Sequence, residues 1–273
     1  MGMRFIQITD THISPDPGFE HYGHRTLANL DAVVDAINAL TFPFDFVLHS
    51  GDVVEDRSEA GYQAARRSLQ RLRAPVYYVA GNHDDADLLR RALIGEPAPV
   101  GRMDYQWMVG GVQVAVFDTR GVRDPSGTLT VQQLSAVRNL CAPDGPPLVI
   151  CLHHPPVPLD SPWLDRGWTV PQGVAPSMLL EEGPQFLEAI RPARQRIRGV
   201  FFGHVHRAYQ VVRDGVLFSS APSVFGQLLT WPDQKDPVPA PHEPGGFCVV
   251  TVTEGETIVR QHAIARPVAG QGA

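Results

Sequence analysis

The segment Phe5-Ile6-Gln7-Ile8-Thr9-Asp10-Thr11-His12 joins a short apolar run to an acid and an imidazole, and this arrangement decides the fold we expect. A similar arrangement, an apolar or aromatic run followed by polar metal-binding side chains, recurs four times. The runs are Phe46–Leu48, Val76–Val79, Leu148–Leu152 and Val200–Phe202, and the segments after them are Gly51-Asp52, Gly81-Asn82-His83-Asp84, His153-His154-Pro155-Pro156 and Gly203-His204-Val205-His206. Such runs predict buried strands. We expect the polar residues to converge at one rim of the sheets, where α/β proteins hold their sites.

Amphipathic helices are predicted between these strands in the first two thirds of the chain. Apolar residues at three- and four-residue spacing predict a helix between the first two strands, at Leu27, Leu30, Val34, Ile37 and Leu40. Leu69 and Leu72 mark a second helix, and the capping-box pattern of Thr130 to Gln133 begins a third, which ends near Leu140.

The last third is expected to be more antiparallel. An Asp214-Gly215 turn joins Tyr209–Val212 to Val216–Phe218 in a predicted hairpin, and Phe247–Val252 is a later strand. The predicted fold class is therefore α/β, a layered sandwich with two central sheets flanked by helices.

Composition favours one globular domain over residues 1–273, with 43% hydrophobic and 19% charged residues. A net charge of −6 argues against polymeric nucleic acid and anionic membranes as partners. Cys141, Cys151 and Cys248 form no C-x-x-C pair, which suggests neither a disulfide framework nor a thiolate zinc site. The first strand begins by Met3 and no apolar run reaches membrane-spanning length, so we expect a cytoplasmic protein without a membrane anchor.

Two stretches, 155–176 and 221–246, are rich in proline and tryptophan and have only weak periodicity. Long loops in a compact domain are usually functional or disordered, and both follow a segment of polar donors. We expect them to be lids or caps that shape a substrate pocket. The alternative is that their tryptophans cover core or a subunit interface, with 221–246 as the arm of a homo-oligomer.

The residue types of the five segments suit a two-metal hydrolase. Asp10 and His12 are two apart after a strand, so an extended chain would turn both to one side, and His204 and His206 repeat that spacing. A single carboxylate such as Asp52 can bridge two cations. Taken singly these signals are weak, because Asp10 or Asp52 also suits a turn.

The motifs around Asn82 and His153 each allow two interpretations. Asn82 offers a neutral amide oxygen to a metal while His83 is free to act on a substrate, and Asn82 could also sit in a turn that caps a helix beginning near Asp84. His153 and His154 are adjacent on a strand, so one is expected to be a ligand and the other an outer or packing residue. All five segments at strand ends make a purely structural explanation improbable.

The ordered set D-x-H, GD, GNHD, HHPP and GHxH resembles the calcineurin-like metallophosphoesterase superfamily. Within it, GNHDD and HHPPVPLD look most like the branch of class III cyclic nucleotide phosphodiesterases and bacterial glycerophosphodiesterases. The resemblance implies a four-layer α-β-β-α fold with mixed sheets and two metal ions bridged by Asp52. One ion would be held by Asp10, His12, Asp52 and His206, and the other by Asp52, Asn82, His153 and His204. It selects His153 rather than His154, places His83 beside the scissile phosphate and matches Tyr22 to a pocket aromatic.

The function expected from this resemblance is hydrolysis of small phosphodiesters, either cyclic nucleotides or glycerophosphodiesters, by in-line attack of a metal-bridging hydroxide. His83, Asp52 and Asn82 would be catalytic, and Tyr22, His83 and Asn82 would contact substrate. The donor types suit iron, manganese, zinc or cobalt. One alternative is a phosphomonoesterase or pyrophosphate hydrolase with the same centre, which would need more basic groups nearby. A more remote alternative is a non-catalytic scaffold.

Overall fold

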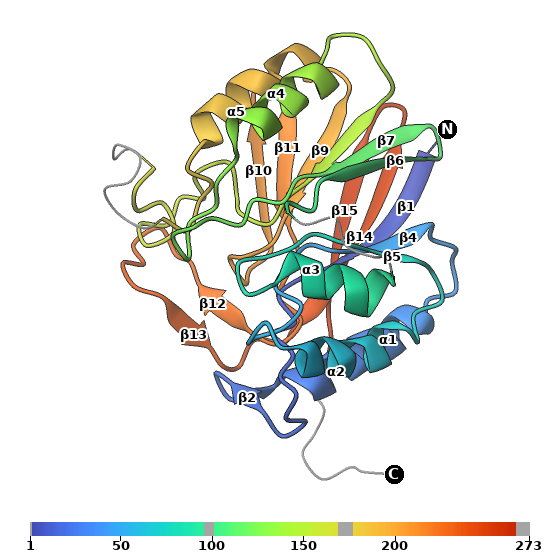
Figure 1. Ribbon diagram of the computed structural model, residues 1–273, viewed down its shortest axis with the longest axis vertical. Helices are drawn as coiled ribbons and strands as arrows, with labels where there is room; N and C mark the ends of the chain where they lie inside the picture. The colour runs from blue at the N-terminus through green and yellow to red at the C-terminus, as the bar shows by residue number, and fades with distance from the viewer. Residues whose placement is uncertain (1, 96–100, 169–176, 266–273) are drawn as a thin grey trace.

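Two mixed β-sheets lie face to face at the centre of the molecule (Figure 1), in a computed structural model that describes residues 2–95, 101–168 and 177–265. The first sheet has the strand order β15 (Thr257–Ala263), β14 (Gly246–Thr253), β1 (Gly2–Ile8), β4 (Phe46–His49) and β5 (Val76–Tyr78). The second has the order β10 (Tyr209–Arg213), β11 (Val216–Ser220), β9 (Ile197–Phe202), β8 (Leu148–Cys151), β7 (Val112–Val116) and β6 (Tyr105–Val109). In the first sheet β1, β4 and β5 run parallel, while β14 pairs antiparallel with both β1 and β15. In the second sheet β11, β9, β8 and β7 run parallel, and the edge strands β10 and β6 are antiparallel to their neighbours.

Helices cover the outer face of each sheet (Figure 1). The first sheet is covered by α1 (Thr26–Asn38), α2 (Glu59–Leu69) and α3 (Ala86–Leu89), the last of which continues into a π-helical turn (Arg90–Ile94). The second sheet is covered by α4 (Val131–Leu140) and α5 (Gly183–Ile190), with a 3-10 turn at Arg191–Ala193. The expected α-β-β-α sandwich is therefore confirmed.

Three apolar cores hold these four layers together. A central core joins the two sheets, and in it the Phe5 ring stacks on Phe46 at 5.0 Å and meets the edge of Phe201 from the opposite sheet at 5.1 Å. One outer core packs α1 and α2 on the first sheet through residues such as Leu30 and Ile37. The other packs α4 and α5 on the second sheet. Because the central strands of each sheet, such as β4 and β8, are buried on both faces, they are largely apolar, which explains the continuous runs in the sequence.

The five predicted strands and the helix from Thr130 are confirmed, and α4 carries the full capping box between Thr130 and Gln133. The first predicted helix is confirmed as α1, which ends at Asn38 and leaves Leu40 beyond it. The second predicted helix is shorter, because α2 ends at Leu69 and leaves Leu72 beyond it. The 209–218 hairpin is confirmed as β10 and β11, with Asp214 and Gly215 both at positive φ as a primed turn requires.

Two short hairpins were not expected from the sequence. One consists of β2 (Glu20–His21) and β3 (His24–Arg25), and the other of β12 (Gln227–Leu229) and β13 (Val238–Ala240). The second lies inside the 221–246 stretch. These elements are too short for a periodic signal, so only tertiary contacts define them.

The two proline-rich stretches pack on each other. The Trp163 indole Nε1 donates to the Leu229 carbonyl at 3.0 Å, and its ring is buried in the core beside α4 and α5. Trp163 therefore covers core, as the alternative expectation had it, whereas Trp231 is 59% exposed. Part of the first stretch, 169–176, lies outside the described residues.

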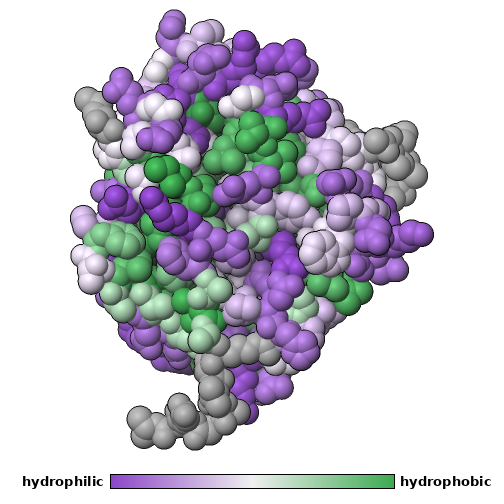
Figure 2. Space-filling model, turned by 180° about the vertical axis from the view of Figure 1, so that it is seen from behind, coloured by the Kyte–Doolittle hydropathy of each residue, from purple (hydrophilic) through white to green (hydrophobic). Residues whose placement is uncertain are grey.

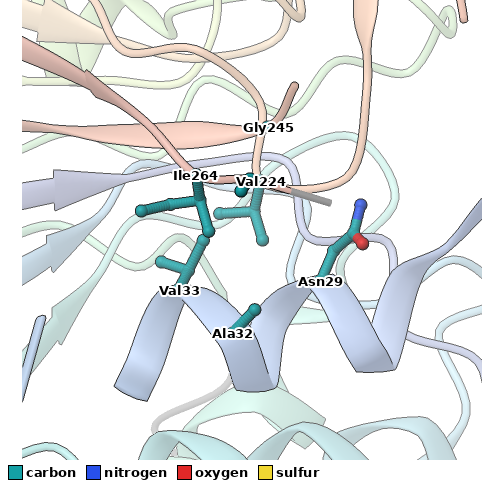
Figure 3. Close-up of a pocket in the computed structure, with 7 residues that line it drawn as sticks. Asn29, Ala32, Val33, Val224, Gly245 and Ile264 are labelled. Carbon is teal, nitrogen blue, oxygen red and sulfur yellow. The ribbon is translucent and has the colours of Figure 1, made fainter. Parts of the chain in front are cut away.

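A small pocket separates α1 from the 222–246 region (Figure 3). Asn29, Val33, Val224 and Ile264 line it, and the Asn29 amide donates to the Phe225 carbonyl at 2.8 Å. This bond fixes the backbone of Phe225 next to helix α1.

On the face seen from behind, hydrophobic groups gather in patches, mainly in the upper half, within a mostly hydrophilic surface (Figure 2). None of the helices in the described ranges is long and apolar enough to cross a membrane.

Candidate metal centre

The candidate donors lie just after the carboxyl ends of β1, β4, β5, β8 and β9, at one rim of the two sheets. Many of them adopt left-handed backbone: φ is positive at Asp10, His12, Asp52, His204 and His206. Asp10 and His12 do offer their ligand atoms to the same cluster, as expected. The expected reason, an extended chain, is wrong. Tight turns, in which Asp10 and Thr11 donate backbone bonds to the carbonyls of Gly51 and Asp52, aim these side chains inward.

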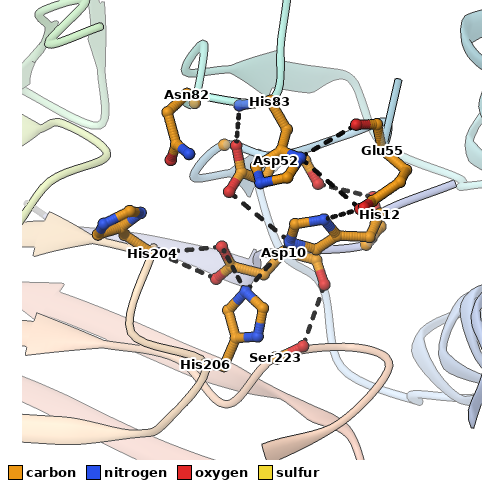
Figure 4. A network of polar contacts seen from close by, with 12 residues as sticks. Asp10, His12, Asp52, Glu55, Asn82, His83, His204, His206 and Ser223 are labelled. Atoms are coloured by element: carbon orange, nitrogen blue, oxygen red, sulfur yellow. Dashed lines mark hydrogen bonds and ion pairs between the residues drawn. The ribbon is translucent and has the colours of Figure 1, made fainter. Parts of the chain in front are cut away.

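Asp10, His12, Asp52 and His206 form one buried group, drawn in Figure 4. The ligand atoms that they offer lie within 4.8 Å of one another. His12 Nε2 is 3.6 Å from Asp52 Oδ2, and His206 Nε2 is 3.6 Å from Asp10 Oδ1. This is the set expected for one ion.

The donors expected for the second ion also converge. His153 Nε2 lies 3.2 Å from Asp52 Oδ2, 3.1 Å from Asn82 Oδ1 and 3.2 Å from His204 Nδ1. Asp52 contacts both groups, which is the position that a bridging carboxylate needs. The backbone N–H of His204 donates to both Asp10 oxygens at 3.1 Å, so the two groups are tied together.

The hydrogen bonds around His12 and His153 fix which ring nitrogen faces the cluster. His12 Nδ1 lies 2.7 Å from Glu55 Oε2 and His153 Nδ1 lies 2.8 Å from the Ser50 carbonyl, and both oxygens only accept. Each Nδ1 therefore carries a proton. The His12 ring, whose pKa burial lowers, is neutral and turns a bare Nε2 inward, whereas burial at His153 is outweighed by the charges of Asp52 and Asp10, which raise its pKa to about 9. Bare His12 Nε2 stands 3.1 Å from His206 Nε2 beside two carboxylates, an arrangement that a cation would stabilise. The residues present fit bound metal ions.

Burial shapes the ionisation of these groups. It lowers the pKa of His12 to about 3 and holds the pKa values of His204 and His206 well below the usual range, so these rings are neutral ligands. Burial raises the pKa of Asp10 to about 7. Burial would also raise that of Asp52, but the charge and hydrogen bond of His153 outweigh it and hold the pKa of this carboxyl well below its ordinary value. A bound cation would favour the ionised form of both acids.

Asn82 and His83 lie on the turn after β5. Asn82 does not cap the following helix: Asp85 does, through bonds to the backbone N–H groups of Asp87 and Leu88. The expectation of a cap from the Asn82 turn is thus wrong, because the Asn82 side chain is turned to His153 and Asp124 instead.

His83 is anchored at its backbone and open at its ring. Its N–H donates to Asp52 Oδ1 at 2.8 Å, its Nδ1 lies 3.0 Å from the Glu55 carbonyl, and its side chain is one third exposed. Burial opposes protonation, but Asp52, the Glu55 carbonyl and the Glu55 charge outweigh it and raise the pKa of His83. His83 can therefore meet a ligand from solvent.

His154 is buried beside this cluster. Its Nδ1 lies 2.8 Å from Thr119 Oγ1 and its ring centre is 4.5 Å from that of His204. His153, His154 and His204 also form a group whose nitrogens could approach a metal ion. The structure thus places His154 next to the donors, whereas His153 alone of the two contacts Asp52 and Asn82.

An aromatic wall borders the first group of donors, formed by Phe225, Tyr22 and His21. The Phe225 ring centre lies 5.2 Å from that of His12 and 5.1 Å from that of His206. Tyr22 is 47% exposed and nearly parallel to Phe225 at 6.3 Å. The predicted pocket aromatic Tyr22 is thus near the donors, although Phe225 makes the closer contacts.

Sequence reasoning missed Glu55, Asp124 and Phe225. Glu55 follows Asp52 by three residues, and its carboxylate contacts His12 while its carbonyl contacts His83. Asp124 and Phe225 lie in loops far from the motifs. A short-range signal existed only for Glu55, as an acid in the same turn as Asp52.

A two-sheet α/β sandwich that gathers two carboxylates, an amide and four imidazoles at one rim has the donors of a metal-dependent hydrolase. Residues 3–208 match the model of the calcineurin-like phosphoesterase family, and the chain belongs to this family.

Curated relatives are similar over most of the chain. The cyclic AMP phosphodiesterase CpdA of Vibrio vulnificus is 29% identical, over 83% of this chain and 78% of its own. The CpdA of Escherichia coli K12 is 27% identical over the same shares of the two chains. Among solved structures, a dimetal phosphatase from Danio rerio superposes with a TM-score of 0.67 at 15% identity, covering 97% of both chains. That likeness shows the fold alone.

Proposed function

We propose that this protein is a metal-dependent phosphodiesterase of small phosphodiesters, with cyclic nucleotides as the first class to consider and glycerophosphodiesters as the second. The observation that carries the proposal is a full set of donors for two ions, with Asp52 between them and the partly exposed His83 ring beside Asp52. The similarity to relatives named cyclic AMP phosphodiesterases supports the diester class.

Each residue has a definite role in this proposal. Asp10, His12, Asp52 and His206 would hold one ion, and Asp52, Asn82, His153 and His204 the other. Iron, manganese, zinc or cobalt suits these nitrogen and oxygen donors. Two such ions would polarise the phosphoryl oxygens and activate water for attack.

His83 would assist departure of the leaving group. With Nδ1–H donated to the Glu55 carbonyl, Nε2 is the nitrogen left to meet substrate. Its raised pKa favours the protonated ring, which neutralises charge on the phosphoryl group and donates a proton to the leaving alkoxide. Tyr22 and Phe225 would offer aromatic surface to the organic part of the diester.

The arginines that could meet a more highly charged substrate are engaged elsewhere. Arg123 pairs with Glu181 and Arg207 with Glu243, and Arg166 donates to the Lys235 carbonyl. A dianionic monoester would gain more from free cations than a monoanionic diester. This favours a diesterase over a phosphomonoesterase or pyrophosphate hydrolase.

The proposal also covers the whole protein. A single domain over 1–273 is supported by the central core shared by both sheets. A cytoplasmic location is supported by three cysteines that are all free. The net charge of −6 supports small substrates rather than polymeric nucleic acid. A homo-oligomer joined through 221–246 would use the exposed Trp231 side chain as part of its interface. Light scattering would measure the oligomeric state.

The test compares hydrolysis of bis(p-nitrophenyl) phosphate, p-nitrophenyl phosphate and 3′,5′-cyclic AMP by protein stripped with chelator and reloaded with Mn²⁺. We expect metal-dependent turnover with a preference for diesters. Asn82→Ala should lower kcat by roughly 100-fold or more, since loss even of an outer-shell partner costs about 10–100-fold. Asn139→Ala, an exposed position on α4, is the matched control. A preference for the monoester would refute the diesterase assignment, and no turnover with bound metal would favour the scaffold.

A further inference from the structure

A carboxylate from the opposite sheet holds the amide of Asn82. The Asn82 Nδ2 donates to Asp124 Oδ1 at 2.8 Å, while Asn82 Oδ1 lies 3.1 Å from His153 Nε2. Asn82 follows β5 of the first sheet, whereas Asp124 lies in the loop between β7 of the second sheet and α4. The contact therefore crosses the rim between the two sheets.

The chemistry of this contact fixes which way the amide points. An amide can present either its oxygen or its NH₂ group to a neighbour, but an ionised carboxylate only accepts hydrogen bonds. Asp124 thus binds the NH₂ end, and the oxygen is left on the side of His153 and Asp52. A metal ion is bound by the amide oxygen and repelled by the NH₂ group, so this orientation is the one that ligation needs.

The loop that carries Asp124 is itself held in place. Arg123 NH2 lies 2.6 Å from both carboxylate oxygens of Glu181, and the Glu181 N–H donates to the Gly127 carbonyl at 2.9 Å. Within the loop, the Ser126 N–H donates to the Arg123 carbonyl at 2.8 Å. Arg123 is therefore directed to Glu181 and not to Asp124, whose carboxylate charge acts on the neighbouring His83 ring and helps to raise its pKa. The acceptor capacity of Asp124 is available to Asn82.

We propose that Asp124 is a positioning residue that locks the Asn82 amide with its oxygen toward the second metal ion. The inference rests on the proposed role of Asn82 as a ligand. It assigns the second ion an outer carboxylate, as Glu55 is the outer carboxylate of His12. Loss of such outer-shell partners commonly weakens metal binding by about 10–100-fold.

The test measures metal binding directly. Stripped wild type and Asp124→Asn are titrated with Mn²⁺ by calorimetry, and bound metal is counted after dialysis against a metal buffer. Asparagine at position 124 can accept or donate, so it no longer forces one orientation of Asn82. We expect wild type to bind two ions, and Asp124→Asn to bind the second about 10-fold or more weakly with the first little changed. At limiting metal, the electron paramagnetic resonance spectrum should change from that of a coupled Mn²⁺ pair in wild type to that of an isolated Mn²⁺ ion in Asp124→Asn.

Three further variants separate positioning from a general loop effect. Asp144→Asn, in an exposed loop away from the site, controls for loss of one surface charge. The double variant Asn82→Asp/Asp124→Asn exchanges the two groups, so that position 82 offers a carboxylate oxygen and position 124 an amide donor. We expect it to bind the second ion more tightly than Asn82→Asp alone, because an asparagine at position 124 can donate to the new carboxylate whereas Asp124 would repel it, and a loop that had merely unfolded would not give this gain.

The outcomes are distinct. Equal affinity of wild type and Asp124→Asn for two ions would overturn the role of Asp124 while leaving the two-metal centre intact. Failure of wild type to bind a second ion would overturn both. A second ion weakened in Asp124→Asn and bound no more tightly by the double variant than by Asn82→Asp, with thermal unfolding of the stripped protein lowered, would show that Asp124 only supports the loop and would overturn positioning.

Discussion

At the scale of single residues, the donors converge because glycines stand directly before or beside them. A side chain at Gly81 would collide with Asp52, one at Gly51 with the His153 ring, and one at Gly203 with Thr9. Gly51 is also at φ +110°, a conformation that other residues rarely adopt. The glycines of the GD, GNHD and GHxH motifs therefore serve close packing of one motif against another.

Gly81→Ala should displace Asp52, the carboxylate shared by both donor groups. We expect Mn²⁺ affinity and diester turnover to fall by about 10-fold or more, as for other losses of ligand orientation, together with a lower thermal midpoint. Calorimetric titration and differential scanning fluorimetry would measure both. Gly255→Ala is the control, because a Cβ there meets nothing within 4 Å. Unchanged metal affinity in Gly81→Ala would contradict this account of the packing.

At the scale of elements, helix termini are set by local chemistry that can be read from the sequence. Helix α4 begins after Thr130, whose Oγ1 accepts from the Gln133 N–H at 3.1 Å while Gln133 Oε1 accepts from the Thr130 N–H at 3.0 Å. The helix then buries Leu134 and Val137 against the second sheet. The cap thus fixes where the covering helix starts, at a distance from the metal donors.

Thr130→Ala removes one half of this capping box. The free energy of unfolding should fall by about 0.5–2 kcal/mol, the usual cost of losing such a cap, with no change in metal affinity. Urea titration of stripped and metal-loaded protein would measure the first, and calorimetry the second. A loss of metal binding in this variant would mean that α4 is coupled to the site.

At the scale of the whole molecule, the cysteines report on the apolar cores. Cys151 and Cys248 belong to the central core between the sheets, and Cys141 to the outer core beside α4. Burial raises the pKa of Cys141 to about 11 and that of Cys248 to about 12, and it raises that of Cys151 further still. The thiolate, which is the reactive form, is therefore disfavoured in the folded protein.

We expect no alkylation of the native protein by iodoacetamide at pH 8, and modification of all three cysteines in urea, as counted by mass spectrometry. The folded state keeps these protons to higher pH than the unfolded chain, whose thiols have a pKa of about 8.5. Their contribution to stability is thus complete below about pH 8.5 and is lost as the pH rises through about 11 for Cys141 and about 12 for Cys248. Labelling of native protein at pH 8 would show that the cores open readily.

The sequence by itself determined the buried strands, the helices with periodic apolar faces, the Asp214-Gly215 hairpin and the set of donor residues. These depend on short-range patterns: continuous apolar runs for strands covered on both faces, a capping box at Thr130, and metal-binding side chains at strand ends. Only the tertiary structure decided how the donors are aimed. The left-handed turns at Asp10 and His12, the Asp124 contact of Asn82, and the approach of Phe225 to His12 each join segments from different sheets or loops. Such contacts leave no periodic trace in the chain, because they depend on distances that exist only once the two sheets have packed.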